Sequence, residues 1–208
     1  MARLLVVCKA NICRSPLIEH LLRVRLAGIA GFEDIRVVSA GVDVTSGHRM
    51  CELAAAEIGN QAATAPHRAR GVTQAMLDSA SLVLTAGRAE RSALAKLSPE
   101  SRTRVFTLKE AVALAGTADQ PLAEQRTTDG GADRLADIAT HLNARRGLLL
   151  LPTHEHASTS WWPFTKKPTD PLEIPDGHNL GDRAHRATIR SAHQAVDQFV
   201  TLLERPRS

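Results

Sequence analysis

Short apolar runs alternate with amphipathic segments along this chain, and this alternation restricts the possible folds more than any other sequence feature. The runs lie at residues 4–7, 35–40, 82–84 and 105–108, and each is too short for a helix. The segments between them have helical spacing of apolar residues. Strands joined by helices form parallel sheets with helices on both faces. We therefore predict an α/β fold with three α/β/α layers around a central four-stranded parallel sheet.

The predicted helices begin and end at recognisable capping residues. The first follows the 4–7 strand, with Ser15 as its N-cap and Pro16 as its first residue. Thr73 is the expected cap of a short helix, and Gly59 the expected end of another. The helical ranges that we predict are 50–58, 73–77, 87–97, 132–146 and 182–204. Regularity weakens at about 115–168, which we interpret as an elaboration of a single domain spanning residues 1–208.

Composition limits the ligands and the compartment. The 208 residues include 26 Lys and Arg against 22 Asp and Glu, a net charge of +4 that is scattered along the chain. This mild excess suits a small anion such as phosphate and does not indicate nucleic acid. No apolar run is long enough to cross a membrane. Three cysteines and no signal-peptide pattern predict a cytoplasmic protein with reduced thiols.

The loop after the first strand combines a thiol with an anion-binding arrangement. Cys8 and Arg14 bracket five residues between the strand and the helix. Backbone N–H groups can therefore point inward at the positive end of the helix, where they form an anion cradle. The helix dipole and the guanidinium would lower the pKa of a thiol in this place, and the Arg14 fork can hold two phosphoryl oxygens. We predict Cys8 as a nucleophile and Arg14 as a ligand of the anion.

Residues 7–16, Val-Cys-Lys-Ala-Asn-Ile-Cys-Arg-Ser-Pro, resemble the signature loop of the low-molecular-weight protein tyrosine phosphatase family, Cys-x-Gly-Asn-x-Cys-Arg-Ser-Pro. The resemblance extends over about residues 3–112 and 168–204. It implies hydrolysis of phosphotyrosine on proteins through a cysteinyl-phosphate intermediate. It also implies a phosphotyrosine-containing protein as partner and no cofactor or metal.

The resemblance assigns further roles within the loop. Ser15 would hydrogen-bond the thiolate, and Asn11 would shape the loop with support from Ser39. Ala10 stands where the family usually has Gly, and a Cβ at a positive φ would cost about 1 kcal/mol. We expect activity to be retained despite Ala10. The predicted phosphate-binding loop comprises Lys9, Ala10, Asn11, Ile12, Cys13 and Ser15.

The leaving group needs a general acid, and two aspartates are candidates. Expulsion of a phenolate requires a carboxylic acid within hydrogen-bond reach. In the family this is an Asp, usually followed by Pro, before the last helix. Asp176 has the matching distance to the final helix, although Gly177 follows it, whereas Asp170 keeps the Asp-Pro pair but lies earlier. We favour Asp176 and keep Asp170 as the alternative.

The remaining polar and aromatic groups have less defined roles. Cys13 could form a reversible disulfide with Cys8, or it could pack at the start of the helix. Cys51 is predicted to be a core residue. The motif His154-Glu155-His156 is predicted to be solvated rather than metal-binding. Trp161 and Trp162 either stack on the substrate ring or anchor the elaboration.

Three other functions compete with phosphotyrosine hydrolysis. Arsenate reduction uses a similar loop but needs resolving cysteines, and no Cys follows Cys51. Phosphoarginine hydrolysis is associated in the family with Thr at the position of Ile12. A phosphoprotein-binding module of weak catalytic power is the third alternative. The sequence does not predict an oligomeric state.

Overall fold

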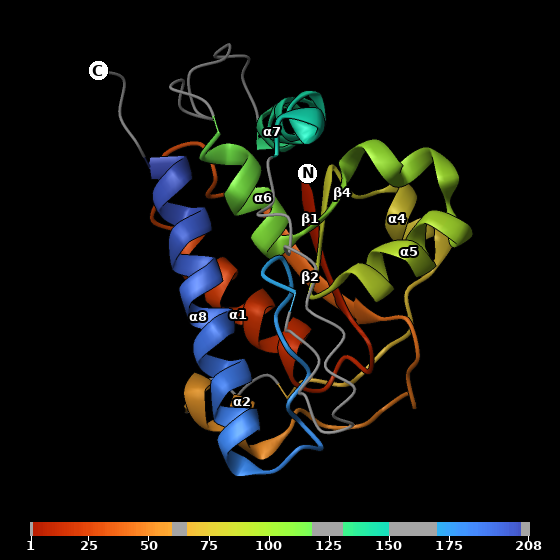
Figure 1. The fold of residues 1–208 in the computed structure, drawn as a ribbon, viewed down its shortest axis with the longest axis vertical. Helices are drawn as coiled ribbons and strands as arrows, with labels where there is room; N and C mark the ends of the chain where they lie inside the picture. Colours follow the sequence, from red (N-terminus) through yellow and green to blue (C-terminus); the bar gives the residue numbers. More distant parts are fainter. Residues whose placement is uncertain (1, 60–65, 118–130, 150–169, 205–208) are drawn as a thin grey trace, which may run out of the picture.

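The computed structural model describes residues 2–59, 66–117, 131–149 and 170–204. Four parallel strands form one sheet in the order β2-β1-β3-β4, which confirms the predicted sheet (Figure 1). The register places Cys8 beside Gly41, at the carboxyl ends of β1 and β2. The strands are β1 (Arg3–Cys8), β2 (Arg36–Gly41), β3 (Leu82–Thr85) and β4 (Val105–Thr107).

Helices cover both faces of the sheet, as the alternation of apolar runs predicts. Leu4 and Val6 of β1 point into one apolar core, whereas Leu5 and Val7 point into the other. This is the period-two alternation of a strand buried on both sides. On the first face lie α1 (Arg14–Leu26), α2 (Glu52–Ile58), α6 (Leu108–Ala115) and α8 (Asp182–Glu204), and α7 (Gly131–Ala144) adds apolar side chains to the same core; on the second face lie α4 (Gln74–Asp78) and α5 (Arg88–Leu97). Short 3-10 helices occupy Pro99–Arg104 and Arg146–Leu148.

Several predicted helix ends are confirmed. The Thr73 side chain accepts a hydrogen bond from the Met76 backbone at 3.2 Å and caps α4. Gly59 ends α2 at a φ of 62°, a conformation that glycine adopts without strain. The last helix, α8, spans the predicted 182–204. Among the described helices, none has the length and apolar character needed to cross a membrane.

The predicted start of the first helix is wrong. Cys13 is the N-cap of α1, so Ser15 and Pro16 lie inside the first turn. The Ser15 hydroxyl does not cap the helix; it contacts Cys8 and Asn11 instead. Pro16 is tolerated there because the N–H groups of a first helical turn have no intrahelical partner.

The fourth predicted strand is too long at its end. The strand β4 stops at Thr107, and Leu108 begins α6, a helix that the apolar pattern did not predict. Thr107 and Glu110 form a capping box, in which the Thr107 hydroxyl accepts from the Glu110 backbone at 3.0 Å. This reciprocal pair starts the helix directly at the strand end.

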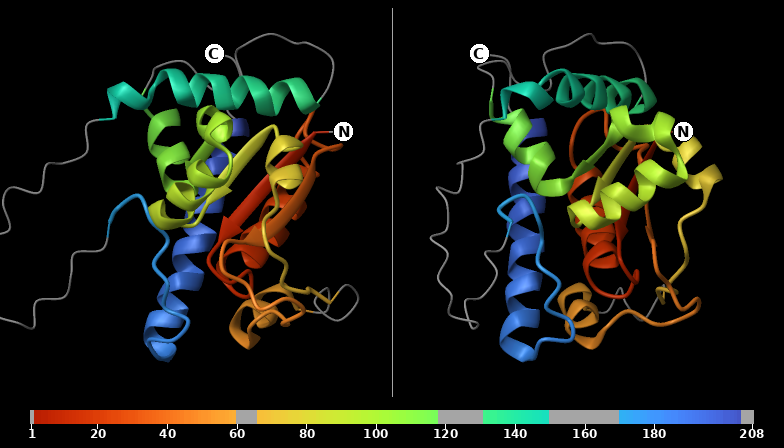
Figure 2. Two further views of the ribbon diagram at one scale, coloured as in Figure 1. Left: turned by 90° about the vertical axis from the view of Figure 1, so that its right-hand side faces the viewer. Right: turned by 45° about the vertical axis from the view of Figure 1, so that its right-hand side comes forward.

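The sheet topology creates a crevice at the carboxyl end of β1. The connection from β1 to β2 passes through α1 on one face, whereas the connection from the neighbouring strand β3 to β4 passes through α5 on the opposite face. The loops that follow β1 and β3 therefore run in opposite directions and leave a crevice between them. Ligands of open α/β sheets bind at this point, which is called the topological switch point. Figure 2 shows α7 across the amino end of the strands, with α2 at the other end.

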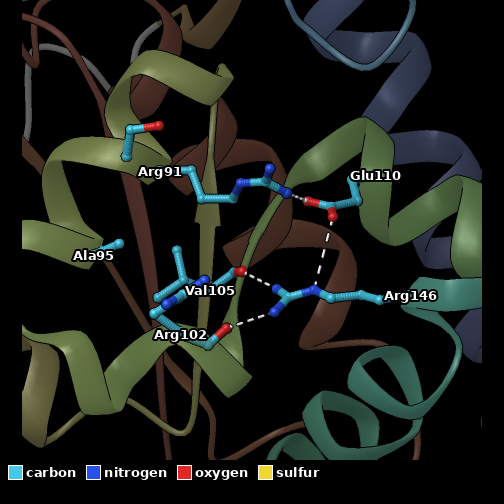
Figure 3. A pocket seen from close by; sticks show the side chains of 7 residues that line it. Arg91, Ala95, Arg102, Val105, Glu110 and Arg146 are labelled. Carbon is cyan, nitrogen blue, oxygen red and sulfur yellow. Dashed lines mark hydrogen bonds and ion pairs between the residues drawn. The ribbon is translucent and has the colours of Figure 1, made fainter.

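Arg146, in the 3-10 helix that follows α7, borders a cavity of about 460 Å³ (Figure 3). The Arg146 guanidinium donates to the carbonyls of Arg102, at 2.7 Å, and Val105. It also lies 4.2 Å from the centre of the Phe106 ring, and its Nε is 3.8 Å from Glu110. Arg146 thus links the segment after α7 to β4 and α6.

Thr107 allows a test of how the fold supports the loop before α8. Its hydroxyl also donates to the Leu172 carbonyl at 2.6 Å. Thr107→Val keeps the shape but removes the hydroxyl, so both the cap and the Leu172 contact are lost. We expect Thr107→Val to lower the free energy of unfolding by about 2 kcal/mol in urea titrations. Thr107→Ser, which keeps the hydroxyl, should lose less, and equal losses in both variants would contradict this role.

Candidate active site

The loop formed by residues 8–15, named here the 8–15 loop, surrounds the sulfur of Cys8. Cys8 is the last residue of β1 and is almost fully buried. Its Sγ lies 3.0 Å from the Ser15 Oγ, and the Asn11 backbone N–H donates to it at 3.3 Å. Cys8 also lines a pocket of about 270 Å³. The pocket is lined by Cys8, Lys9, Ala10, Ile12, Cys13, Arg14, Asp43, Thr45, His48, Asp176, His178 and Asn179.

Asn11 organises this loop from a fully buried position. Its amide Nδ2 donates to the Ser15 Oγ at 2.8 Å and to the Ser39 Oγ at 2.9 Å. Its Oδ1 accepts from the Arg70 backbone at 3.0 Å, and its own carbonyl accepts from the His67 Nε2 at 2.7 Å. The structure therefore brings Asn11, Ser15 and Ser39 together, and it adds two residues that the sequence did not single out for a role in the site.

Ala10 does not have the positive φ that would make its Cβ unfavourable. Among the described residues other than glycine, Asn11 alone has a positive φ, at 55°. Asn is the residue type that tolerates this left-handed region best after glycine. The Cβ of Ala10 therefore has no cost from backbone conformation.

Arg14 begins α1 and lies almost fully buried beside the pocket. Its Nη2 is 2.5 Å from the Asp176 Oδ2 and 3.3 Å from the Glu90 Oε1, while its Nη1 donates to the Ile174 carbonyl at 3.4 Å. Glu90 comes from the first turn of α5 and is 5% exposed. A buried carboxylate beside a buried guanidinium fixes the direction of the fork. Sequence analysis missed Glu90, because it is one of several charged residues in a helix with an ordinary amphipathic pattern.

The two candidate acids occupy different places. Asp176 lines the pocket and contacts Arg14, with its side chain 48% exposed. Asp170 is instead paired with the Arg88 Nε at 2.9 Å, and its Oδ1 accepts from the Leu172 backbone at 2.9 Å. It does not line the pocket. The geometry therefore favours Asp176, and Asp170 makes the local turn that is common for aspartate.

The loop of residues 170–181, named here the 170–181 loop, is fastened to α8 at Gly177. The Gly177 N–H donates to the Thr188 Oγ1 at 2.9 Å, and the same hydroxyl lies 2.9 Å from the Pro175 carbonyl. A Cβ on Gly177 would overlap the Ala184 carbonyl. Proline could neither donate this hydrogen bond nor fit this space, which explains the departure from the Asp-Pro pattern.

Cys13 and Cys51 form a thiol pair next to the pocket. Both lie close to the Nε2 of His185, at 3.1 Å for Cys13 and 3.4 Å for Cys51. The hydrogen bond between the two thiols, supported by His185, lowers the pKa of Cys51, and the same contact together with burial raises the pKa of Cys13. Cys51 is half-buried at the start of α2, and no disulfide joins the three cysteines.

Two expectations fall on residues outside the described ranges. The motif His154-Glu155-His156 and the aromatic residues Trp161 and Trp162 all lie in 150–169. Their predicted roles therefore stay predictions.

Comparison with known proteins assigns the family. The family model for low molecular weight phosphotyrosine protein phosphatase matches residues 3–158, which include the 8–15 loop and most of the elaboration at about 115–168. The chain belongs to this phosphatase family. The predicted recognition, fold class and enzyme class are thereby confirmed.

Individual phosphatases support the same assignment. The chain is 35% identical over 109 residues to a probable low molecular weight protein-tyrosine-phosphatase, EpsP, of Ralstonia solanacearum, covering 51% of this chain and 70% of that protein. It is 31% identical over 111 residues to a protein-arginine-phosphatase of Geobacillus stearothermophilus, covering 53% of this chain and 71% of that protein. The crystal structure of the tyrosine phosphatase Wzb from Escherichia coli K30 shares the fold, with a TM-score of 0.58, 20% identity and 96% coverage of both chains.

Gly41 gives a test of how tightly this phosphatase packs β2 against the 8–15 loop. A Cβ on Gly41 would overlap the Lys9 carbonyl and lie 3.0 Å from the Asn11 nitrogen. We expect Gly41→Ala to lower the kcat/KM for p-nitrophenyl phosphate by about 100-fold, because small displacements of reacting groups have large effects on rate. Gly71, which pairs with Gly41 across a β-bridge, has open space around it. Gly71→Ala is therefore the matched control, and similar rates for the two variants would contradict the packing argument.

Proposed function

We propose that this protein hydrolyses phosphotyrosine in protein substrates, with Cys8 as the nucleophile. The observation that carries the proposal is the meeting of three groups in one pocket: the Cys8 sulfur, the Arg14 guanidinium and the Asp176 carboxyl. A nucleophile, an anion ligand and an acid are the parts that phosphoryl transfer through a covalent intermediate requires.

In the first step, the Cys8 sulfur attacks phosphorus and the bond from phosphorus to the phenolic oxygen breaks. Arg14 holds two equatorial oxygens of the phosphoryl group, because its fork matches their spacing. Asp176 donates its proton to the leaving oxygen, so that tyrosine departs neutral. Asp176 can leave Arg14 when the dianion binds, because its side chain is half-exposed, whereas Glu90 stays buried behind the guanidinium.

In the second step, water attacks phosphorus and the bond from sulfur to phosphorus breaks. Asp176, now ionised, accepts the proton of the water, and inorganic phosphate leaves. Ser15 and the Asn11 N–H stabilise the charge that returns to the Cys8 sulfur, because both lie within hydrogen-bond distance of it. No metal or cofactor takes part in either step.

Phosphotyrosine is the substrate class that the pocket favours over phosphoarginine. Ile12 lines the pocket and offers an apolar surface to an aromatic ring, but no hydroxyl to a guanidinium nitrogen. Arsenate reduction has no specific support, and the acid in the pocket favours hydrolysis over simple phosphoprotein binding. The free thiols suit the cytoplasm. We also propose that residues 1–208 form one domain, since Leu135 and Leu142 of α7 join the core of the sheet.

Cys8→Ser separates an enzyme from a binding module. We expect the variant to lose all measurable release of phosphate from a phosphotyrosyl peptide, because no sulfur remains to form the intermediate, while it still binds the peptide. Fluorescence anisotropy with a labelled peptide measures this binding. The wild type should act on the phosphotyrosyl peptide faster than on a phosphoarginyl peptide of the same sequence. An inert wild type that binds the peptide would instead show a binding module.

Substitution of the two aspartates tests the general acid. Asp176→Asn should slow the hydrolysis of phenyl phosphate by about 100-fold or more. The loss should be smaller for p-nitrophenyl phosphate, because its leaving group needs less protonation. Asp170→Asn is the control and should keep this leaving-group dependence unchanged. The assignment fails if Asp170→Asn, rather than Asp176→Asn, produces the selective loss.

A further inference from the structure

Four potential metal ligands meet beside the pocket, and the proposed steps of hydrolysis assign no role to their side chains. They are Cys13, Cys51, His178 and His185, whose ligand atoms all lie within 4.8 Å of one another. Cys13 lies in the 8–15 loop, Cys51 precedes α2, His178 lies in the 170–181 loop and His185 lies in the first turn of α8. Elements far apart in the sequence thus deliver two sulfurs and two ring nitrogens to one point.

The distances from the His185 Nε2 to the other three ligand atoms are close to those between the ligands of a tetrahedral metal ion. Its Nε2 lies 3.1 Å from the Cys13 Sγ, 3.4 Å from the Cys51 Sγ and 3.5 Å from the His178 Nδ1. Zinc bonds of about 2.3 Å to sulfur and about 2.0–2.1 Å to nitrogen place tetrahedral ligand atoms about 3.3–3.8 Å apart. The rings of His178 and His185 are perpendicular, with centroids 4.9 Å apart, so they do not stack against each other. Shifts of about an ångström would therefore complete the coordination.

The surroundings also suit a bound ion. Cys13 and His185 are 4% and 8% exposed, which holds them in place. Cys51 and His178 are half-buried, so that an ion can reach the cluster from solvent. Two thiolates and two imidazoles form a donor set that is common in closed zinc sites and poorly suited to Mg²⁺ or Ca²⁺.

We propose that Cys13, Cys51, His178 and His185 form a Cys2His2 binding site for Zn²⁺. The site is separate from the chemistry of phosphoryl transfer, because it excludes Cys8, Arg14 and Asp176. It shares a wall with the pocket, however, since Cys13 and His178 also line that pocket. A bound ion would join the 8–15 loop to the 170–181 loop only two residues from Asp176, and it would occupy Cys13.

Titration with Co²⁺ tests this site directly. Untagged, reduced protein freed of metal by chelation should bind one Co²⁺ per chain, with the absorption of a tetrahedral, thiolate-ligated ion. One equivalent of Zn²⁺ should abolish this absorption. Cys51→Ser and His185→Gln should each weaken Zn²⁺ binding by at least about tenfold. Circular dichroism checks that these variants fold, and Ser is a favourable N-cap at position 51.

Three control variants distinguish this site from other thiols and imidazoles. Cys8→Ser should keep the Co²⁺ absorption, because Cys8 is not a ligand. His193→Gln, on the same helix but paired with Glu57, should also keep it, as should the double variant His154→Gln and His156→Gln. Absence of tetrahedral absorption in the wild type would overturn the proposal. Loss of absorption in Cys8→Ser or in the double histidine variant, with retention in Cys51→Ser, would overturn it as well.

Thermal unfolding gives a second measurement that does not depend on absorption or on catalysis. A ligand that binds only the folded state raises Tm. Zn²⁺ should therefore raise the Tm of the wild type and of Cys8→Ser, and the same Zn²⁺ concentration should raise that of Cys51→Ser by clearly less. An equal rise in all three proteins would contradict the proposed ligands. Because neither measurement needs phosphatase activity, failure of the proposed hydrolysis would leave this result unaffected.

Discussion

The hydrogen bonds of Asn11 are the interaction on which the candidate site depends. A loop that points its N–H groups at an anion cannot pair those groups with its own carbonyls, so other residues must fix its shape. Asn11 does this from a fully buried position, through Ser15 and Ser39 on one side and through Arg70 and His67 on the other. Its left-handed backbone turns the loop back over the Cys8 sulfur.

A second set of contacts brings the end of the chain to this loop. The Thr107 hydroxyl holds Leu172, the Ala86 carbonyl accepts from Ile174, and Thr188 holds Gly177. These contacts leave Asp176 above Arg14 with an exposed side chain. The proposed acid is therefore carried by a well-anchored loop, while its carboxyl remains able to exchange places with a phosphoryl group.

Local sequence patterns predicted most helices and strands. They failed where a side chain that could cap a helix makes a tertiary contact instead. Thr73 and Gly59 act as predicted, because a cap needs only its neighbouring backbone. Ser15 has a good capping side chain, but its hydroxyl is used by Cys8 and Asn11. The start of α6 does have a sequence signal, the capping-box spacing of Thr107 and Glu110. The signal was missed because the apolar run of the preceding strand continues through Leu108.

The sequence by itself determined the parallel sheet, the place of the Cys8 to Arg14 loop after β1, and the two aspartates from which the acid is drawn. These follow from periodicity and from motifs within a few residues of each other. Only the tertiary structure brought Asp176 to Arg14 and paired Asp170 with Arg88, placed Glu90 behind Arg14, and gathered Cys13, Cys51, His178 and His185. Such choices depend on distances between residues far apart in the chain, which are set by packing across the whole core and leave no local pattern.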